Sequence, residues 1–222
     1  MSVLGFLIPV AVLGLIAWAI VGFTRSRGAD PFTLATATAL YARVLLIAGI
    51  LMSLTGAGVI LKAAFGFINL SYSYYNYQYP VGKPLPDGSV VSGPQANYFE
   101  QQRAQDLVLG VTLVVIGLLV AIAHFYLARA VARMPGGAPG WVTRGTLLAL
   151  TVMTAIGGVP SAAIGLYQML SYFIIGSSPQ NQQPWGEPLG LAIAFIPAWI
   201  YAMTRLVSDL RSPPAVAPAP VA

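Results

Sequence analysis

The sequence predicts an all-α integral membrane protein with five transmembrane helices, because charge is scarce and five long apolar segments are present. Of the 222 residues, 57% are hydrophobic and only 8% are charged, whereas soluble domains carry about 25% charged residues. A soluble chain with so little charge would expose large apolar patches and aggregate. A transmembrane helix needs about 20 apolar residues, and five segments meet that requirement. The chain is therefore expected to fold in lipid.

The first predicted helix covers residues 3–23, which contain no charged residue. No basic segment precedes it and no clear cleavage site follows it, so we expect it to be retained rather than removed as a signal peptide. The remaining helices are expected at about 40–70, 106–128, 145–175 and 189–208. The fourth is longer than one crossing requires, so a tilt or a kink at Pro160 is expected. Pro197 lies inside the fifth.

Connecting segments divide the chain into a first helix, two hairpins and a tail. The first hairpin covers residues 24–133 and includes an outer loop at 71–105. A segment rich in proline and glycine begins the second hairpin, which covers residues 134–211. Residues 212–222 are rich in proline and alanine, which predicts a disordered cytoplasmic tail.

The distribution of basic residues predicts the orientation in the membrane. Lys83 and Arg103 fall on one side of the predicted helices and seven arginines fall on the other. These seven are Arg25, Arg27, Arg129, Arg133, Arg144, Arg205 and Arg211. Because cytoplasmic loops carry the excess of basic residues, we expect the N-terminus outside and the C-terminus in the cytoplasm of a bacterial-type inner (plasma) membrane. The basic residues form no cluster, so the net charge of +5 does not indicate nucleic-acid binding.

The two hairpins show signs of an internal repeat. A shift of 101 residues superimposes five pairs of identical or similar residues. The pairs are Arg43 with Arg144, Met52 with Met153, Ser53 with Thr154, Gly56 with Gly157, and Ala57 with Gly158. Two copies of the same topology would be related by an axis along the membrane normal. The alternative is coincidence, because glycine, alanine and leucine are common in membrane helices.

The paired hairpins, Arg43 at the start of the second helix, and the run from Gly117 to His124 resemble a bacterial family of polytopic membrane proteins known only as a domain of unknown function. The resemblance covers roughly residues 40–210. The fifth helix departs from the family pattern, with Pro197 at the glycine position and Thr204 at the histidine position. The resemblance implies a membrane architecture and, because that family has no assigned activity, adds nothing on function.

Small residues recur at four-residue spacing in the second and fourth predicted helices. The positions are Gly49, Ser53 and Ala57 in one, and Gly157, Ser161 and Gly165 in the other. Such ladders let membrane helices approach closely. We favour the interpretation that these two helices pack against each other within the protein. The alternative is that one ladder faces a neighbouring subunit.

Polar residues at membrane depth are functional candidates by default. Arg43 and Lys62 bound 18 uncharged residues, about 27 Å of helix, so both are interpreted as anchors whose side chains extend to the headgroups. Lys62 has the alternative of pairing with Asp106 or Glu100. Those two acids and Arg103 lie three residues apart and could form a salt-bridge strip along one helix face.

His124 is the only histidine of the chain. We expect it to be a hydrogen-bonded residue near the cytoplasmic end of the third helix, and we predict no cofactor. The minor alternative is that its imidazole binds a pigment or a haem. With no cysteine in the chain, disulfides and thiolate metal sites are excluded.

The outer loop contains tyrosines at nearly alternate positions, which predicts an extended segment with one aromatic face. These residues are Tyr72, Tyr74, Tyr75, Tyr77 and Tyr79, and Trp185 lies in the second outer loop. One interpretation is an aromatic belt at the membrane surface. The other, equally favoured, is a surface that docks a partner protein, because tyrosine is enriched at interfaces.

The sequence contains no nucleophile–base set, metal-ligand cluster, glycine-rich phosphate loop or paired carboxylates, so we expect no enzymatic activity. We predict a structural or accessory subunit of a larger membrane complex, in contact with lipid and other subunits. The alternative is a small carrier or channel, in which Pro160 and Pro197 would free backbone carbonyls for a substrate. Ser161 and Gln168 are the polar residues near Pro160 that a substrate pathway would use.

Overall fold

The computed structural model describes residues 33–74, 96–134, 140–175 and 184–211. The predicted first helix (residues 3–23) and the Pro/Ala-rich tail lie outside the described residues. Tyr75, Tyr77 and Tyr79 also lie outside them.

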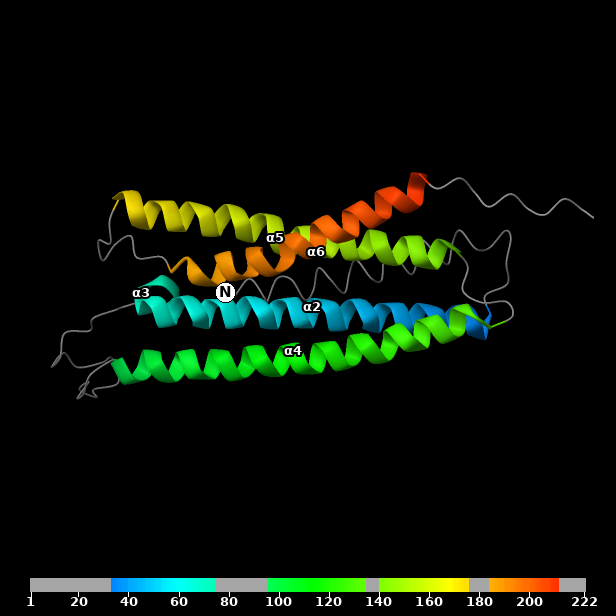
Figure 1. The fold of residues 1–222 in the computed structure, drawn as a ribbon, viewed down its shortest axis with the longest axis horizontal. Helices are drawn as coiled ribbons and strands as arrows, with labels where there is room; N and C mark the ends of the chain where they lie inside the picture. Colours follow the sequence, from blue (N-terminus) through cyan, green and yellow to red (C-terminus); the bar gives the residue numbers. More distant parts are fainter. Residues whose placement is uncertain (1–32, 75–95, 135–139, 176–183, 212–222) are drawn as a thin grey trace, which may run out of the picture.

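Every long element in the described part of the chain is an α-helix. These are α2 (Leu34–Ile68), α4 (Ala96–Ala132), α5 (Gly140–Ile175) and α6 (Gly186–Arg211), with a short α3 (Leu70–Ser73) after α2. Figure 1 shows the four long helices running along the long axis of the molecule. All four are long and apolar enough to cross a membrane. The predicted helical membrane architecture is therefore confirmed for four helices, one fewer than the five predicted.

All four helices begin before the apolar segments that predict them. Thr33 caps α2, because its Oγ1 accepts a hydrogen bond from the backbone N–H of Thr36 at 3.2 Å, as is usual for threonine at this position. Helix α4 begins at Ala96 instead of about 106, so the end of the predicted outer loop is helical. The thickness of the lipid limits the apolar segment and not the helix, which can continue into the polar region.

The first part of the tyrosine segment is helical, so the prediction of an extended conformation is wrong there. Leu70–Ser73 forms α3. The Ser73 hydroxyl donates to the carbonyl of Lys62 at 2.6 Å, which holds this turn against α2. Tertiary contacts of this kind override a local pattern.

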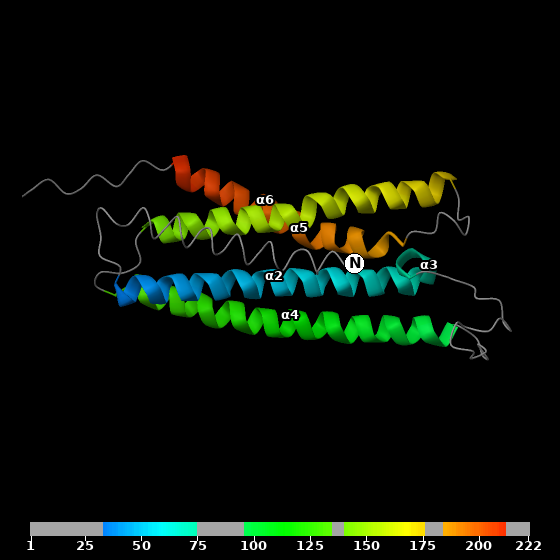
Figure 2. The same ribbon diagram turned by 180° about the vertical axis from the view of Figure 1, so that it is seen from behind.

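Helix α2 lies in the middle of the arrangement, with α4 on one side and the pair α5 and α6 on the other. The view from behind in Figure 2 shows the same order. Helices α2 and α4 run side by side along most of their length, whereas α5 and α6 cross. At the crossing, Gly157 lies against the ring of Phe195 and Gly158 lies against Ile196.

Glycines allow α2 and α4 to approach closely. A Cβ added at Gly49 would lie 2.6 Å from the backbone nitrogen of Ala121 and 2.7 Å from the carbonyl oxygen of Gly117. Seven residues further along α2, a Cβ at Gly56 would lie 2.6 Å from the carbonyl oxygen of Gly110. Two antiparallel pairs of glycines therefore bring the two backbones together.

The interpretation that the two small-residue ladders pack against each other is wrong. Gly49 and Ser53 face α4, where Ser53 lies against Gly117. Gly157 and Gly165 face α6, where Gly165 lies against Leu189. Each ladder is thus used inside its own hairpin. Ser161 is buried on the same helix as Gly165, and Ala57 is half-buried.

The two hairpins meet at both ends of α2. Near the end of α2 the contact is with the first turns of α6, where Gly58 lies against Leu191. Near its beginning, Ala39 packs with Val131 of α4 and Val142 of α5 in a small buried core. The second half of α6 diverges from α2 in both views.

Candidate functional site

The main polar cluster lies at the end of the molecule where α2 ends and α6 begins, which we call the α3 end. Lys62 of α2 contacts two carboxylates there, with its Nζ 2.9 Å from Asp106 Oδ2 of α4 and 3.6 Å from Glu187 Oε2 of α6. The side chains of Lys62 and Asp106 are 13% and 18% exposed. One lysine therefore connects the two hairpins through an ion triad of Lys62, Asp106 and Glu187.

Tyr74 completes this cluster. Its hydroxyl donates a hydrogen bond of 2.8 Å to Asp106 Oδ2, and its ring lies 5.0 Å from the Lys62 ammonium. Tyr74 is 3% exposed and follows α3, which lies outside the long helices. Burial first, and then the hydrogen bond to the Asp106 carboxylate, raises the pKa of the Tyr74 phenol well above its usual value of 10.0.

The pKa of Tyr74 predicts a loss of stability in alkaline solution. A phenol whose pKa is raised by folding contributes stability below its unfolded pKa of about 10, and this contribution is lost as the pH rises above that value. We expect the melting temperature in detergent to fall more steeply between pH 9.5 and 11 for the wild type than for Tyr74→Phe. Tyr126→Phe, which changes an exposed tyrosine of α4, should keep the wild-type slope. Equal slopes for all three proteins would contradict the assignment.

An aromatic cluster lies beside the ion triad. The ring of Trp185 lies 4.7 Å from that of Tyr72 and 5.2 Å from that of Phe65. Tyr72 also contacts Tyr172 of α5 edge-on at 5.6 Å. Rings from α2, α3, α5 and the residue before α6 therefore pack together within the chain.

The aromatic residues predicted to dock a partner are thus used inside the protein where they are described. Trp185 is 5% exposed and Tyr74 is 3% exposed, and Tyr72 is half-buried. A side chain that is buried by its own chain offers almost no area to a partner. Trp185 and Tyr74 are therefore corrected from docking residues to packing residues.

The ion triad also corrects the interpretation of Lys62 as a headgroup anchor. Its ammonium is held by Asp106, which was the alternative partner, and by Glu187, which the sequence interpretation missed. Among the described residues, Glu100 makes no ion pair, and Arg103 instead turns to α2. Its guanidinium stacks 4.0 Å from the Phe67 ring centroid and contacts the carbonyl of Gly66 at 3.4 Å. The predicted salt-bridge strip is therefore not formed.

Fewer polar contacts join the helices at the opposite end. Arg144 of α5 donates to Asp209 of α6 at 2.9 Å, and both side chains are well exposed. Arg43 is half-buried and has no ion-pair partner within the described part of the chain. Its role as an anchor near the membrane surface stays a prediction.

His124 lies on α4 facing the start of α2. Its Nδ1 is 2.8 Å from the carbonyl oxygen of Val120, and its ring meets that of Tyr41 edge-on at 5.6 Å. The backbone contact leaves Nε2 as the ring nitrogen for a ligand. The described residues contain no group of three or more His, Asp or Glu side chains placed to hold a metal ion.

The residues proposed for a transport pathway do not converge. Pro160 and Pro197 are exposed on the outer sides of α5 and α6, whereas Ser161 is buried in the packing between helices. Gln168 is half-buried two turns beyond Ser161 on α5. A substrate site at mid-membrane would need these groups to face one common space.

The polar cluster is a structural contact that joins three helices. Both carboxylates of the triad face a lysine, and Asp106 also accepts the Tyr74 hydrogen bond. Such groups neutralise one another and fix the separation of α2, α4 and α6. The resemblance carried by Gly117 and His124 stays a prediction. Comparison of the chain with protein-family models, with curated proteins and with solved structures found no match.

Proposed function

We propose that the chain is a non-catalytic structural or accessory subunit of a larger membrane protein complex. The observation that carries this proposal is the open order of the helices, in which α2 separates α4 from the pair α5 and α6. A monomeric carrier or channel encloses a pathway between its helices. An open row instead presents broad apolar faces, on which lipid or other subunits pack.

Helix α4 offers the largest such face. Its window of highest hydropathy is only 17% buried, the lowest share among the four candidate spans. The exposed apolar side chains include Val108, Val111, Val115, Leu119 and Ile122. Their spacing of three and four residues places them on one side of the helix. We propose this side of α4 as the docking face, in place of the buried Trp185 and Tyr74.

The positions of the charges support the same proposal. The ion triad lies at one end of the helices and the pair of Arg144 and Asp209 lies at the other. An ion-conducting protein places charged or polar groups along its pathway. In the described helices, the middle of the arrangement is instead occupied by small and apolar side chains, such as Gly157, Gly158 and Phe195.

The proposal includes five transmembrane helices, with residues 3–23 as the first, an outer N-terminus and a cytoplasmic C-terminus in a bacterial-type inner membrane. It also includes the origin of the hairpins by duplication. Two antiparallel pairs, α2 with α4 and α5 with α6, support a duplication, as does the use of a glycine ladder within each pair.

Extraction from the source membrane in a mild detergent tests the proposal. We expect the chain to elute in a complex much larger than its own 23.3 kDa, with the same partner proteins in each preparation by mass spectrometry. Replacement of Leu119 and Ile122 of the α4 face by tryptophan should reduce the recovery of partners while leaving the melting temperature of the pure chain within a few degrees. A chain that elutes alone, free of partners, would overturn the proposal.

The position of two prolines near the crossing of α5 and α6 favours the second candidate, a small carrier. Each proline removes one backbone hydrogen bond and frees a carbonyl four residues earlier. This candidate predicts solute or ion flux in proteoliposomes of the pure protein, abolished by Pro160→Ala or Gln168→Ala. The carrier is the weaker candidate, because Pro160, Pro197 and Gln168 do not face one common space. A pigment or haem at His124 predicts a visible absorption band that disappears in His124→Ala.

A further inference from the structure

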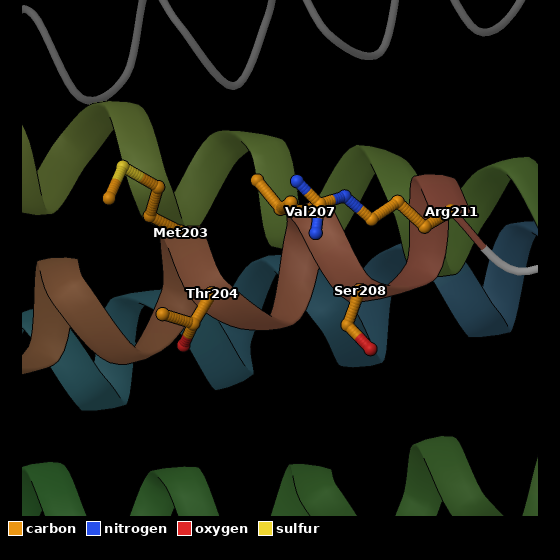
Figure 3. A pocket seen from close by; sticks show the side chains of 5 residues that line it. All are labelled: Met203, Thr204, Val207, Ser208 and Arg211. Carbon is orange, nitrogen blue, oxygen red and sulfur yellow. The ribbon is translucent and has the colours of Figure 1, made fainter.

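The second half of α6 carries a surface hollow of about 550 Å³. Figure 3 shows the five side chains that line it, all from this one helix: Met203, Thr204, Val207, Ser208 and Arg211. All five are exposed, although most of the first half of the same helix is buried or half-buried between α2 and α5. The hollow therefore lies on the part of α6 that diverges from α2.

The chemistry of the hollow suits an apolar helix. Met203 and Val207 supply apolar area, and Thr204 and Ser208 are small residues four apart, a spacing that permits close approach of a second helix. The Thr204 hydroxyl donates to the carbonyl of Tyr201 at 2.8 Å. Because this hydroxyl is already satisfied, an apolar partner can cover it at little cost. Arg211 lies at the end of the helix, where its charge can remain in water.

The length of chain before α2 limits where its apolar segment can lie. Residues 3–23 contain no charge and would make a helix of about 31 Å. They are joined to Thr33, the cap of α2, by the nine residues 24–32, which span at most about 30 Å when extended. The start of α2 and the second half of α6 lie towards the same end of the molecule in both views.

Helices α4 and α5 already cover part of the surface of α2 near its start. Ala39 and Ala42 are fully buried, and the core of Ala39, Val131 and Val142 brings α4 and α5 against this part of α2. A further helix within reach of Thr33 can cover the exposed side of the second half of α6, which lies towards the same end of the molecule. It would run in the same direction as α6, because its C-terminal end must reach the start of α2.

We propose that residues 3–23 pack as a transmembrane helix into the hollow formed by Met203, Thr204, Val207, Ser208 and Arg211. The C-terminal half of this segment faces the hollow. The helix formed by residues 3–23 then covers the part of α6 that diverges from α2. This assignment rests on the proposed transmembrane helix at residues 3–23, but not on the accessory role, since it concerns only contacts within the chain.

Disulfide cross-linking in the membrane tests the proposal directly, because the natural chain has no cysteine. Thr204→Cys is combined with one cysteine at a time at positions 13–23, and the membranes are oxidised. We expect disulfides within one chain at positions three or four residues apart in the scan, identified by mass spectrometry. Leu119→Cys on the exposed face of α4 replaces Thr204→Cys in the control series, which should give at least tenfold less product.

Three outcomes overturn the proposal. The first is that no position gives a disulfide, and the second is that Leu119→Cys gives equal yields. The third is that disulfides form only between two chains, which would place a second copy of the protein in the hollow. A second measurement uses single-cysteine variants. Alkylation of Ser208→Cys by a membrane-permeant maleimide should become several-fold faster when residues 1–23 are deleted, whereas that of Leu119→Cys should not change. An unchanged rate at Ser208→Cys would also overturn the proposal.

Discussion

Replacing Gly117 by isoleucine is expected to separate α2 from α4 and to destroy the first hairpin. A Cβ at this position would lie 2.5 Å from the Ser53 hydroxyl and 2.7 Å from both the carbonyl oxygen of Gly49 and the backbone nitrogen of Ser53. Two of these three atoms are backbone atoms of α2, so no side-chain rotation relieves the overlap. The helices must move apart along the whole glycine contact.

Overpacking of a well-packed core costs about 1–3 kcal/mol where side chains can adjust. We expect the loss for Gly117→Ile to reach or exceed the upper end of that range, because the obstacle is backbone. The measurement is the midpoint of unfolding in mixed micelles of a mild detergent and SDS, read by circular dichroism. Gly140→Ile is the matched control, since a Cβ at Gly140 has no neighbour within 4 Å and its midpoint should stay near that of the wild type. Similar midpoints for the two variants would contradict the close approach.

The sequence predicts the four described candidate membrane spans because length and apolar composition alone define them. Four of the five long uncharged segments correspond to described helices of 26 to 37 residues. The helix ends differ from the prediction by up to ten residues, at Ala96, because polar residues continue a helix outside the lipid. A hydropathy pattern carries no information about where that continuation stops.

The partner of a small-residue ladder cannot be read from the ladder itself. Gly49 and Gly56 are seven residues apart on α2, and their partners Gly117 and Gly110 are also seven residues apart on α4. The matching spacing on consecutive antiparallel helices is the signal that would have predicted this pairing. The repeat across the two hairpins favours a pairing of α2 with α5 instead, although equivalent positions in two copies need not touch.

The sequence indicates one of the two ion pairs of the triad, that of Lys62 with Asp106, and not the pair with Glu187. Asp106 was recognised as an alternative partner of Lys62 because both were expected on the outer side of adjacent helices. Glu187 was missed, although it is an acidic residue in the first turn of α6, where the helix dipole favours a negative charge. Its contact with Lys62 depends on α6 lying against α2, and the order of the helices does not follow from their sequences.

Replacing Lys62 by methionine is expected to destabilise the protein by about 2–4 kcal/mol. Methionine keeps the length of the side chain and removes the charge, which leaves Asp106 and Glu187 facing each other without a cation. Loss of one partner of a fully buried ion pair costs about 3–5 kcal/mol. The loss is smaller here because the Glu187 side chain is 37% exposed and can be hydrated.

Two further variants separate the triad from a general effect of charge. In Lys62→Met with Asp106→Asn, the asparagine oxygen can still accept from Tyr74 and the more buried of the two unpaired charges is gone. The remaining Glu187 side chain is 37% exposed and can be hydrated, so at least half of the lost stability should return. Arg144→Met breaks the pair with Asp209, whose side chains are 55% and 38% exposed, and should cost no more than about 1 kcal/mol. If Lys62→Met costs no more than Arg144→Met in the same detergent assay, the lysine is a headgroup anchor after all. If Lys62→Met lowers the stability and Asp106→Asn restores it, Lys62 is the residue that holds the two hairpins together.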